Sequence, residues 1–110
     1  MQGGATGGGL TSKQRRWLRG EAHGLSPLVQ VGGKGVTGAV AAELDRALAV
    51  HELVKVRLAG ERDERRAAAE ELADRTRAEV VGLVGRVATL YRQHPDPESR
   101  RYRLPGGALY

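Results

Sequence analysis

Apolar residues recur along the chain at two spacings, of which the first is helical. Between Ser12 and about Ala22, Trp17 and Leu18 fall on one arc when residues are placed about 100° apart. Ser12 can serve as the N-cap, and Gly24 can end the segment. A first helix is predicted here, apolar on one side and cationic on the other, where Lys13, Arg15, Arg16 and Arg19 lie.

The residues that follow predict a strand and then a second helix. Residues 28–31 form a short apolar run that is closed by Gly32 and Gly33. Thr37 is a suitable N-cap for a helix that reaches about Val50. The helical repeat of its apolar residues predicts a buried face made of Val40, Leu44, Ala47 and Leu48.

Alternation of apolar and basic residues predicts a second strand at Leu53–Leu58. Every second residue from Val54 onward is apolar, whereas Lys55 and Arg57 lie between them. Side chains of a strand alternate between its two faces, so one face is apolar and the other is basic. Because the two cations need water or a ligand, we expect part of one sheet face to stay open.

The last third of the chain predicts a third helix and a hairpin. Residues 61–78 are rich in Ala, Arg and Glu and indicate a helix, whose thin apolar stripe consists of Ala68, Leu72 and Ala73. Residues 80–84 and 87–91 indicate two strands that are joined by a tight turn at Gly85 and Arg86.

The order of these elements, α-β-α-β-α-β-β, predicts a single compact α/β domain with a four-stranded mixed sheet and three helices. Strand-helix-strand crossovers favour parallel neighbours, and the final hairpin adds an antiparallel pair. A chain of 110 residues has room for one such domain. We expect a disordered glycine-rich leader at residues 1–9, the domain at residues 10–92 and an irregular, proline-containing tail at residues 93–110.

Composition excludes several classes of protein. There is no Cys, so disulfides, thiolate metal sites and Cys nucleophiles are excluded. No apolar run approaches the roughly 20 residues needed to cross a bilayer, and the N-terminus lacks the apolar stretch of a signal peptide. We therefore expect a cytoplasmic protein with no membrane partner.

The net charge of +5 is unevenly distributed. Residues 1–58 carry eight cations and four anions, and residues 80–110 carry five and two. Residues 59–79 reverse the sign, with five cations and seven anions. This pattern is typical of one face that binds a polyanion and another that is turned away from it, although ordinary solubilising charge would look similar.

The sharpest local feature is a GxxG loop between the first strand and the second helix, formed by Gly32, Gly33, Lys34 and Gly35. Amides of a glycine turn, followed by the positive end of a helix dipole, can hold phosphate, and Lys34 adds a full charge. A bare GxxG also occurs as a simple flexible turn. A nucleotide-binding P-loop fits poorly because its GxxxxGK[ST] pattern is absent.

Further cations lie on the predicted first helix, on the basic face of the second strand and around the hairpin. Each alone could be an ordinary solvated charge, but all of them lie outside the acidic segment. Together with the loop, the candidate RNA-binding residues are Lys13, Arg15, Arg16, Arg19, Lys55, Arg57, Arg86 and Arg92.

Nothing in the sequence indicates catalysis. His23, His51 and His94 stand alone without the spacing of a metal site, and no Ser lies in a nucleophile motif. We expect no enzymatic activity, metal, cofactor or small-molecule substrate. Aromatic residues are few and Trp17 lies on the apolar arc, which favours recognition of RNA backbone and shape over stacking on bases.

An ordered series of segments resembles the CRM domain, named for chloroplast RNA splicing and ribosome maturation, whose single-domain bacterial form is the YhbY-like protein. The resemblance covers residues 10–105 and rests on residues 10–14, 22–23, 27–32, 35–37, 42–44, 51–56, 90–92 and 102–105. It implies an α/β domain similar to the C-terminal domain of translation initiation factor three. It also implies RNA binding through residues 32–35 and the surrounding basic surface, and association of bacterial members with precursors of the large ribosomal subunit.

These observations favour a non-enzymatic ribosome assembly factor that binds ribosomal RNA in large-subunit precursors. Three alternatives remain open. The chain could bind intron or small RNA, it could be a protein-interaction adaptor that docks through its acidic third helix, or it could be a small nucleotide-binding enzyme.

Overall fold

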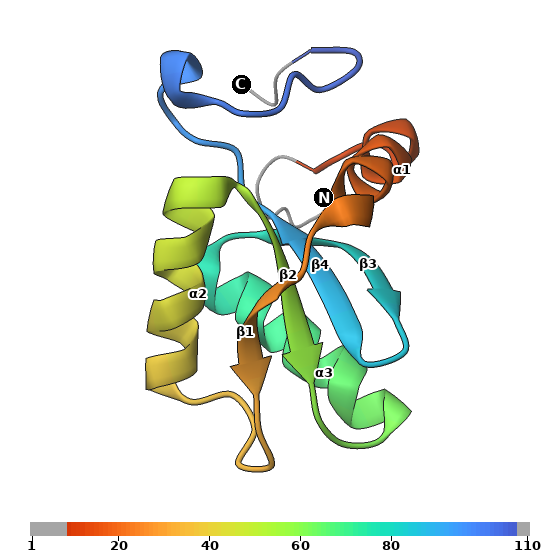
Figure 1. Cartoon of the computed structure of the whole chain (residues 1–110), viewed down its shortest axis with the longest axis vertical. Helices are drawn as coiled ribbons and strands as arrows, with labels where there is room; N and C mark the ends of the chain where they lie inside the picture. The colour runs from red at the N-terminus through yellow and green to blue at the C-terminus, as the bar shows by residue number, and fades with distance from the viewer. Residues whose placement is uncertain (1–8, 108–110) are drawn as a thin grey trace.

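The computed structural model describes residues 9–107, so the predicted leader, apart from Gly9, and residues 108–110 of the predicted tail lie outside the described part. The α/β prediction is confirmed: three helices and a four-stranded mixed sheet form one domain (Figure 1). The elements are α1 (Ser12–Glu21), η2 (Ala22–Gly24), β1 (Pro27–Val31), α2 (Gly38–His51), β2 (Leu53–Leu58), α3 (Arg62–Thr76), β3 (Glu79–Val84), β4 (Val87–Tyr91) and η3 (Pro97–Ser99).

The sheet has the strand order β1-β2-β4-β3. β1 and β2 are parallel, whereas β4 is antiparallel to both β2 and β3. β4 therefore lies inside the sheet although it is the last strand in the sequence. Helices α2 and α3 cover one face, and α1 covers only one end of the other face (Figure 1).

Two apolar clusters hold these layers together. The larger one joins the sheet to α2 and α3 and contains Val56, Leu44 and Leu72, each fully buried. The smaller one lies under α1, where Leu18 packs with Tyr91. Val54, Val56 and Leu58 all belong to the larger cluster, so the predicted apolar side of β2 faces α2 and α3.

The helix starts follow from their capping residues. Thr37 caps α2 as predicted, because its side chain accepts the Val40 N–H at 3.2 Å. α1 is capped by Thr11 and not by Ser12, which is the first helical residue. The Thr11 hydroxyl accepts the Gln14 N–H and the Gln14 side chain accepts the Thr11 N–H, both at 3.0 Å. This reciprocal pair satisfies two amides, which a single bond to Ser12 would not do.

Residues 93–107 contain only one short helical turn, η3, yet they pack closely on the domain. Leu104 is buried in the smaller cluster, and the Gln14 side chain donates to the carbonyl oxygens of Pro105 at 2.9 Å and Gly107 at 3.2 Å. The tail is thus irregular in backbone but is part of the core beneath α1.

Tyr102 connects this tail to the aromatic residues of the core. Its ring centroid lies 6.3 Å from that of Trp17 and 6.5 Å from that of Tyr91, both in edge-to-face geometry. Burial raises the pKa of the Tyr102 phenol above its ordinary value, and the negative charge of Glu21 raises it further.

Candidate nucleic-acid interface

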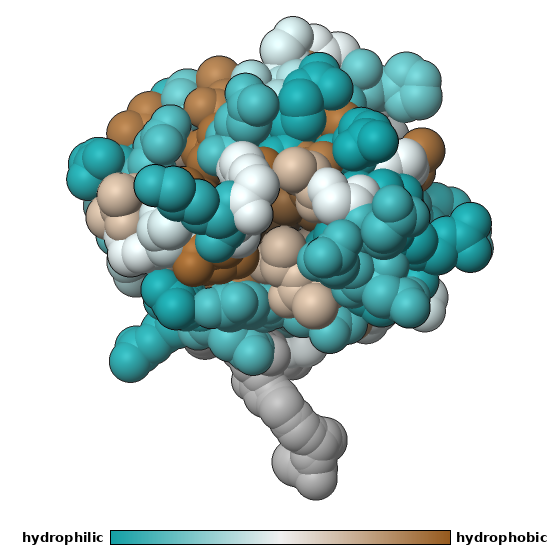
Figure 2. All heavy atoms as spheres, turned by 90° about the horizontal axis from the view of Figure 1, so that it is seen from below, coloured by the Kyte–Doolittle hydropathy of each residue, from teal (hydrophilic) through white to brown (hydrophobic). Residues whose placement is uncertain are grey.

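The glycine loop lies at the end of the sheet where β1 and β2 both finish. Val31, the last residue of β1, is paired with Leu58, the last residue of β2. The loop projects from this end of the molecule (Figure 1), and Gly32, Gly33 and Lys34 are exposed. Seen from this end, the surface is mostly hydrophilic around a smaller pale and apolar area (Figure 2).

The loop is a turn closed on itself. The Gly35 N–H donates to the Gly32 carbonyl at 3.0 Å, and the φ angle of Gly35 is 78°, which favours glycine. Of the four loop amides expected to face a ligand, this one is therefore used inside the turn. A Cβ added at Gly32 or Gly33 would meet nothing within 4 Å, and neither residue has a positive φ. The fold does not require glycine at these two positions.

The hairpin turn lies beside the same end of the sheet. The Leu58 N–H donates to the Arg86 carbonyl at 2.7 Å, and the Arg86 side chain is exposed. Arg65 in the first turn of α3 also reaches this place, since it donates to the Gly85 carbonyl at 2.9 Å and to the Gly60 carbonyl at 2.6 Å. Sequence reasoning missed Arg65, because neither contact is visible from the helical pattern.

The acidic segment does not turn away as a whole. The contacts of Arg65 bring the start of α3 to the loop end of the molecule. Glu61 and Glu64 lie in this first part of α3, where they form a capping box. Helix α3 packs with α2 on the sheet face opposite Lys55 and Arg57, yet its first turn lies at the loop end, so the acidic segment is separated from the cationic surface only in part.

The sheet face opposite α2 and α3 stays partly open, as the alternation of β2 predicts. Lys55 is half-buried and Arg57 is exposed on this face. Both line a hollow of about 560 Å³ that is bounded on one side by Arg19 of α1. Val87 and Thr89 of β4 also line it, and the two-residue period of the predicted strand 87–91, which puts both on one face, was the signal that could have revealed them.

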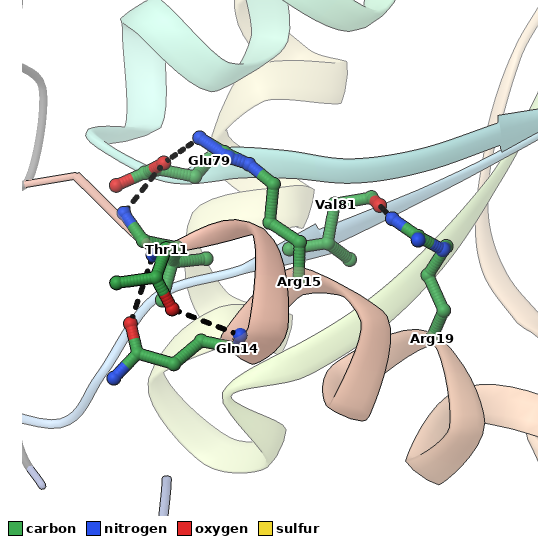
Figure 3. A network of polar contacts seen from close by, with 7 residues as sticks. Thr11, Gln14, Arg15, Arg19, Glu79 and Val81 are labelled. Carbon is green, nitrogen blue, oxygen red and sulfur yellow. Dashed lines mark hydrogen bonds and ion pairs between the residues drawn. The ribbon is translucent and has the colours of Figure 1, made fainter. Parts of the chain in front are cut away.

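The four cations of α1 divide into two kinds. Arg15 forms an ion pair with Glu79 of β3 at 2.6 Å, and Arg19 donates to the Val81 carbonyl at 2.8 Å (Figure 3). Lys13 and Arg16 are exposed. The helix therefore uses Arg15 and Arg19 to hold β3, although Arg19 is exposed as Lys13 and Arg16 are.

Arg92 lies apart from the other candidate residues. It follows β4 at the end where β2 begins, since Tyr91 is paired with Leu53. Its guanidinium donates to the Asp45 carboxylate at 2.7 Å and to the Thr76 carbonyl at 2.8 Å. The structure does not bring Arg92 together with the glycine loop or with Arg57.

Two further kinds of functional feature, a metal site and a membrane-spanning helix, are absent from the described residues. Across residues 9–107, no three His, Asp or Glu side chains are grouped so that they could hold a metal ion. No helix within the same residues has both the length and the apolar character needed to span a bilayer. Of the three histidines, His94 accepts the Asp96 N–H at 3.0 Å and His23 and His51 are exposed.

Known proteins resemble this chain in sequence and in structure. A profile of the CRS1/YhbY (CRM) domain matches residues 10–92. A probable RNA-binding protein of Pseudomonas aeruginosa is 44% identical over 89 residues, which are 80% of this chain and 86% of the relative. An RNA-binding protein of Haemophilus influenzae is 39% identical over 97 residues, 87% of this chain and 95% of that protein.

A solved structure also resembles this chain in its fold. The solution structure of a hypothetical Staphylococcus aureus protein, a candidate RNA-binding protein, matches with a TM-score of 0.77 at 33% identity. The match covers 88% of this chain and 100% of the other. The chain belongs to the CRS1/YhbY (CRM) domain family.

Proposed function

We propose that this protein is a non-enzymatic RNA-binding protein that holds RNA backbone at the loop Gly32–Gly35 and along the cationic open face of the sheet. We further propose that its target is ribosomal RNA in precursors of the large ribosomal subunit and that it acts in ribosome assembly. The relatives named as RNA-binding proteins support the first part. The resemblance to YhbY-like proteins motivates the second.

The observation that carries the proposal is the pair of glycines that the fold does not need. Gly32 and Gly33 have open space where a Cβ would lie and no left-handed backbone. Glycine in such a place leaves the backbone bare, so that a phosphate can approach closely. Lys34 at the exposed tip supplies the charge that neutralises it.

Cations beyond the loop extend the surface that RNA backbone could follow. Arg86 is exposed at the hairpin turn, directly beside the end of β2, and Arg57 is exposed one residue before that end. Lys13 and Arg16 are exposed on α1. Arg15 and Arg19 are bonded to residues of β3, so we assign them first to the positioning of α1 on the sheet.

The proposal is tested by the salt dependence of binding to a single-stranded RNA oligonucleotide. If about five cations engage the strand, affinity falls about 100-fold between 50 and 200 mM salt. Lys34→Gln is expected to lower affinity and to make the slope of log affinity against log salt shallower by about 0.7. Arg46→Gln removes the same charge from exposed α2 and serves as the control. Affinity that does not change with salt would refute the mechanism.

The ribosomal part has its own experiment. Cell extract is sedimented at low magnesium, and each ribosomal fraction is probed for the protein. We expect the protein with precursors of the large subunit. If the protein binds an RNA oligonucleotide but is recovered only in fractions without ribosomal particles, its target would be a different RNA, such as an intron or a small RNA.

A further inference from the structure

The hollow on the open sheet face has the composition of a site for one unpaired nucleotide. We use the name floor for its uncharged lining residues Pro27, Val84, Val87 and Thr89, and the name rim for its cationic lining residues Arg19, Lys55 and Arg57. None of the described residues that line it is acidic. We propose that an unpaired RNA base enters this hollow while its phosphates contact the cationic rim. This inference rests on the proposed RNA binding and adds a base subsite to it.

The apolar part of the hollow is what a backbone-only mechanism does not explain. Val84 is 79% exposed, although it belongs to a strand. Val87 of β4, which also lines the hollow, is only half-buried. Phosphate and ribose gain little from apolar side chains, whereas the face of a nucleobase gains from contact with them.

The rim is held in place before any ligand arrives. Arg19 donates to the Val81 carbonyl at 2.8 Å, and its aliphatic carbons lie over Gly82, where an added Cβ would be 3.0 Å from Cδ. The guanidinium is therefore fixed against β3 beside the hollow, and a guanidinium plane can stack on a base. No Phe, Tyr or Trp is among the described residues that line the hollow, and His23 carries their one aromatic ring, so the guanidinium would add to the stacking surface that this imidazole offers.

Size and charge together select the occupant. A hollow of about 560 Å³ falls within the range of small-ligand sites, which is about 300–1,000 Å³, so it suits one nucleotide and not a duplex. The cationic rim complements a polyanion, and Arg57 continues it toward the end of the sheet where the glycine loop lies. A strand whose backbone follows these cations would place a base in the hollow that Val87 lines.

The first test compares a single-stranded oligoribonucleotide with a strand of the same length and charge that carries abasic sites. We expect the wild-type protein to bind the complete strand about tenfold more tightly, the size expected for one well-held base. Val87→Leu narrows the hollow and should reduce this preference to less than about threefold. Val50→Leu makes the same change on α2, where Val50 is 56% exposed, and should keep the full preference.

The second test uses only the wild-type protein, so its result does not depend on whether a variant folds. An oligoribonucleotide with one 4-thiouridine is crosslinked to the wild-type protein by light, and the attached peptide is identified by mass spectrometry. We expect the crosslink within β3 or β4, near Val84 or Val87. Equal binding of complete and abasic strands, or crosslinks confined to other segments, would overturn the base subsite while RNA binding stands. Failure to bind either strand would instead remove the proposed function, and this inference with it.

Discussion

The carboxylate of Glu52 accepts the backbone N–H of His94 at 2.6 Å, across 42 positions of sequence. Its other oxygen accepts the Arg101 N–H at 2.5 Å. Glu52 also caps the end of α2 with a φ of 65°, and its own carbonyl accepts the Arg92 N–H at 2.9 Å. One buried acid thus joins the helix end, β4 and the C-terminal tail.

Glu52→Gln is expected to lower the free energy of unfolding by about 1–3 kcal/mol, because a carboxamide offers one oxygen where two amides need acceptors. Urea unfolding measures this loss, and faster hydrogen exchange at His94 and Arg101 would locate it in the tail. Glu98→Gln, at an exposed position in η3, is the matched control. Equal stability of the two variants would mean that the tail is held mainly by its apolar residues.

Arg15→Ala is expected to affect stability more than RNA affinity. Glu79 has only 10% of its side chain exposed, and its Oε2 atom has no hydrogen-bond partner among the described residues. Removal of Arg15 leaves a nearly buried charge without its ion pair, which should cost about 1–3 kcal/mol. Lys13→Ala on the exposed side of α1 should show the opposite pattern: unchanged unfolding and weaker RNA binding. Thermal unfolding and RNA titration of both variants check the division.

Two glycines of the loop are expected to respond differently to alanine. Gly35→Ala forces an L residue to a φ of 78° and should lower stability by about 1–2 kcal/mol. Gly33→Ala has open space and ordinary φ, so unfolding should change by less than about 0.5 kcal/mol while RNA affinity falls. If Gly33→Ala binds RNA as tightly as the wild type, the bare backbone at this position has no role in holding phosphate.

The raised pKa of Tyr102 predicts that the free energy of unfolding decreases in alkaline solution. Its pKa is raised, so the folded protein favours the neutral phenol and gains stability that is complete at pH below the unfolded pKa of about 10. This contribution is lost as the pH rises through the higher folded pKa. Tyr102→Phe keeps the ring contacts with Trp17 and Tyr91 and should lose less stability between pH 9 and 11.5. Parallel denaturant unfolding curves for both proteins test the difference.

The adaptor alternative makes a separate prediction. If the protein docked a partner through α3, Lys34→Glu would leave binding intact, and charge reversal at Glu70 and Glu71 would abolish it. We expect the reverse for RNA: Lys34→Glu weakens binding at least about tenfold, and the α3 variant binds at least as tightly as the wild type. Glu71 is already paired with Arg75 at 2.9 Å, so this variant needs a check of its unfolding temperature.

Local patterns predicted the helices and strands because each pattern can be read within the element itself, even where its cause is packing on another element. Alternation in Leu53–Leu58 follows from one face packing on α2 and α3, and the Thr37 cap follows from its bond to the next turn. The choice of Thr11 over Ser12 could not be read from cap preference alone, because both residues are good caps. It depends on Gln14, which also bonds to the tail at Pro105.

The partners of individual cations could not be predicted, because they come from distant segments. Arg15 and Glu79 are 64 positions apart, and Arg92 meets Asp45 across 47 positions. A helical arc shows which side of α1 is cationic but not that β3 supplies acceptors beneath it. The charge totals of sequence segments likewise do not reveal the role of Arg65. Its contacts with Gly60 and Gly85 depend on where two loops meet.

The position of β4 has a consequence for biosynthesis. This strand is inserted between β2 and β3, and it carries Val87 and Thr89 of the hollow. A nascent chain whose residues 87–91 have not yet left the ribosome contains β2 and β3 but lacks the strand that pairs with both. Its sheet therefore ends at β2. The surface that we propose contacts RNA is therefore assembled in a late step of folding, and chains truncated before this strand should be unable to form it.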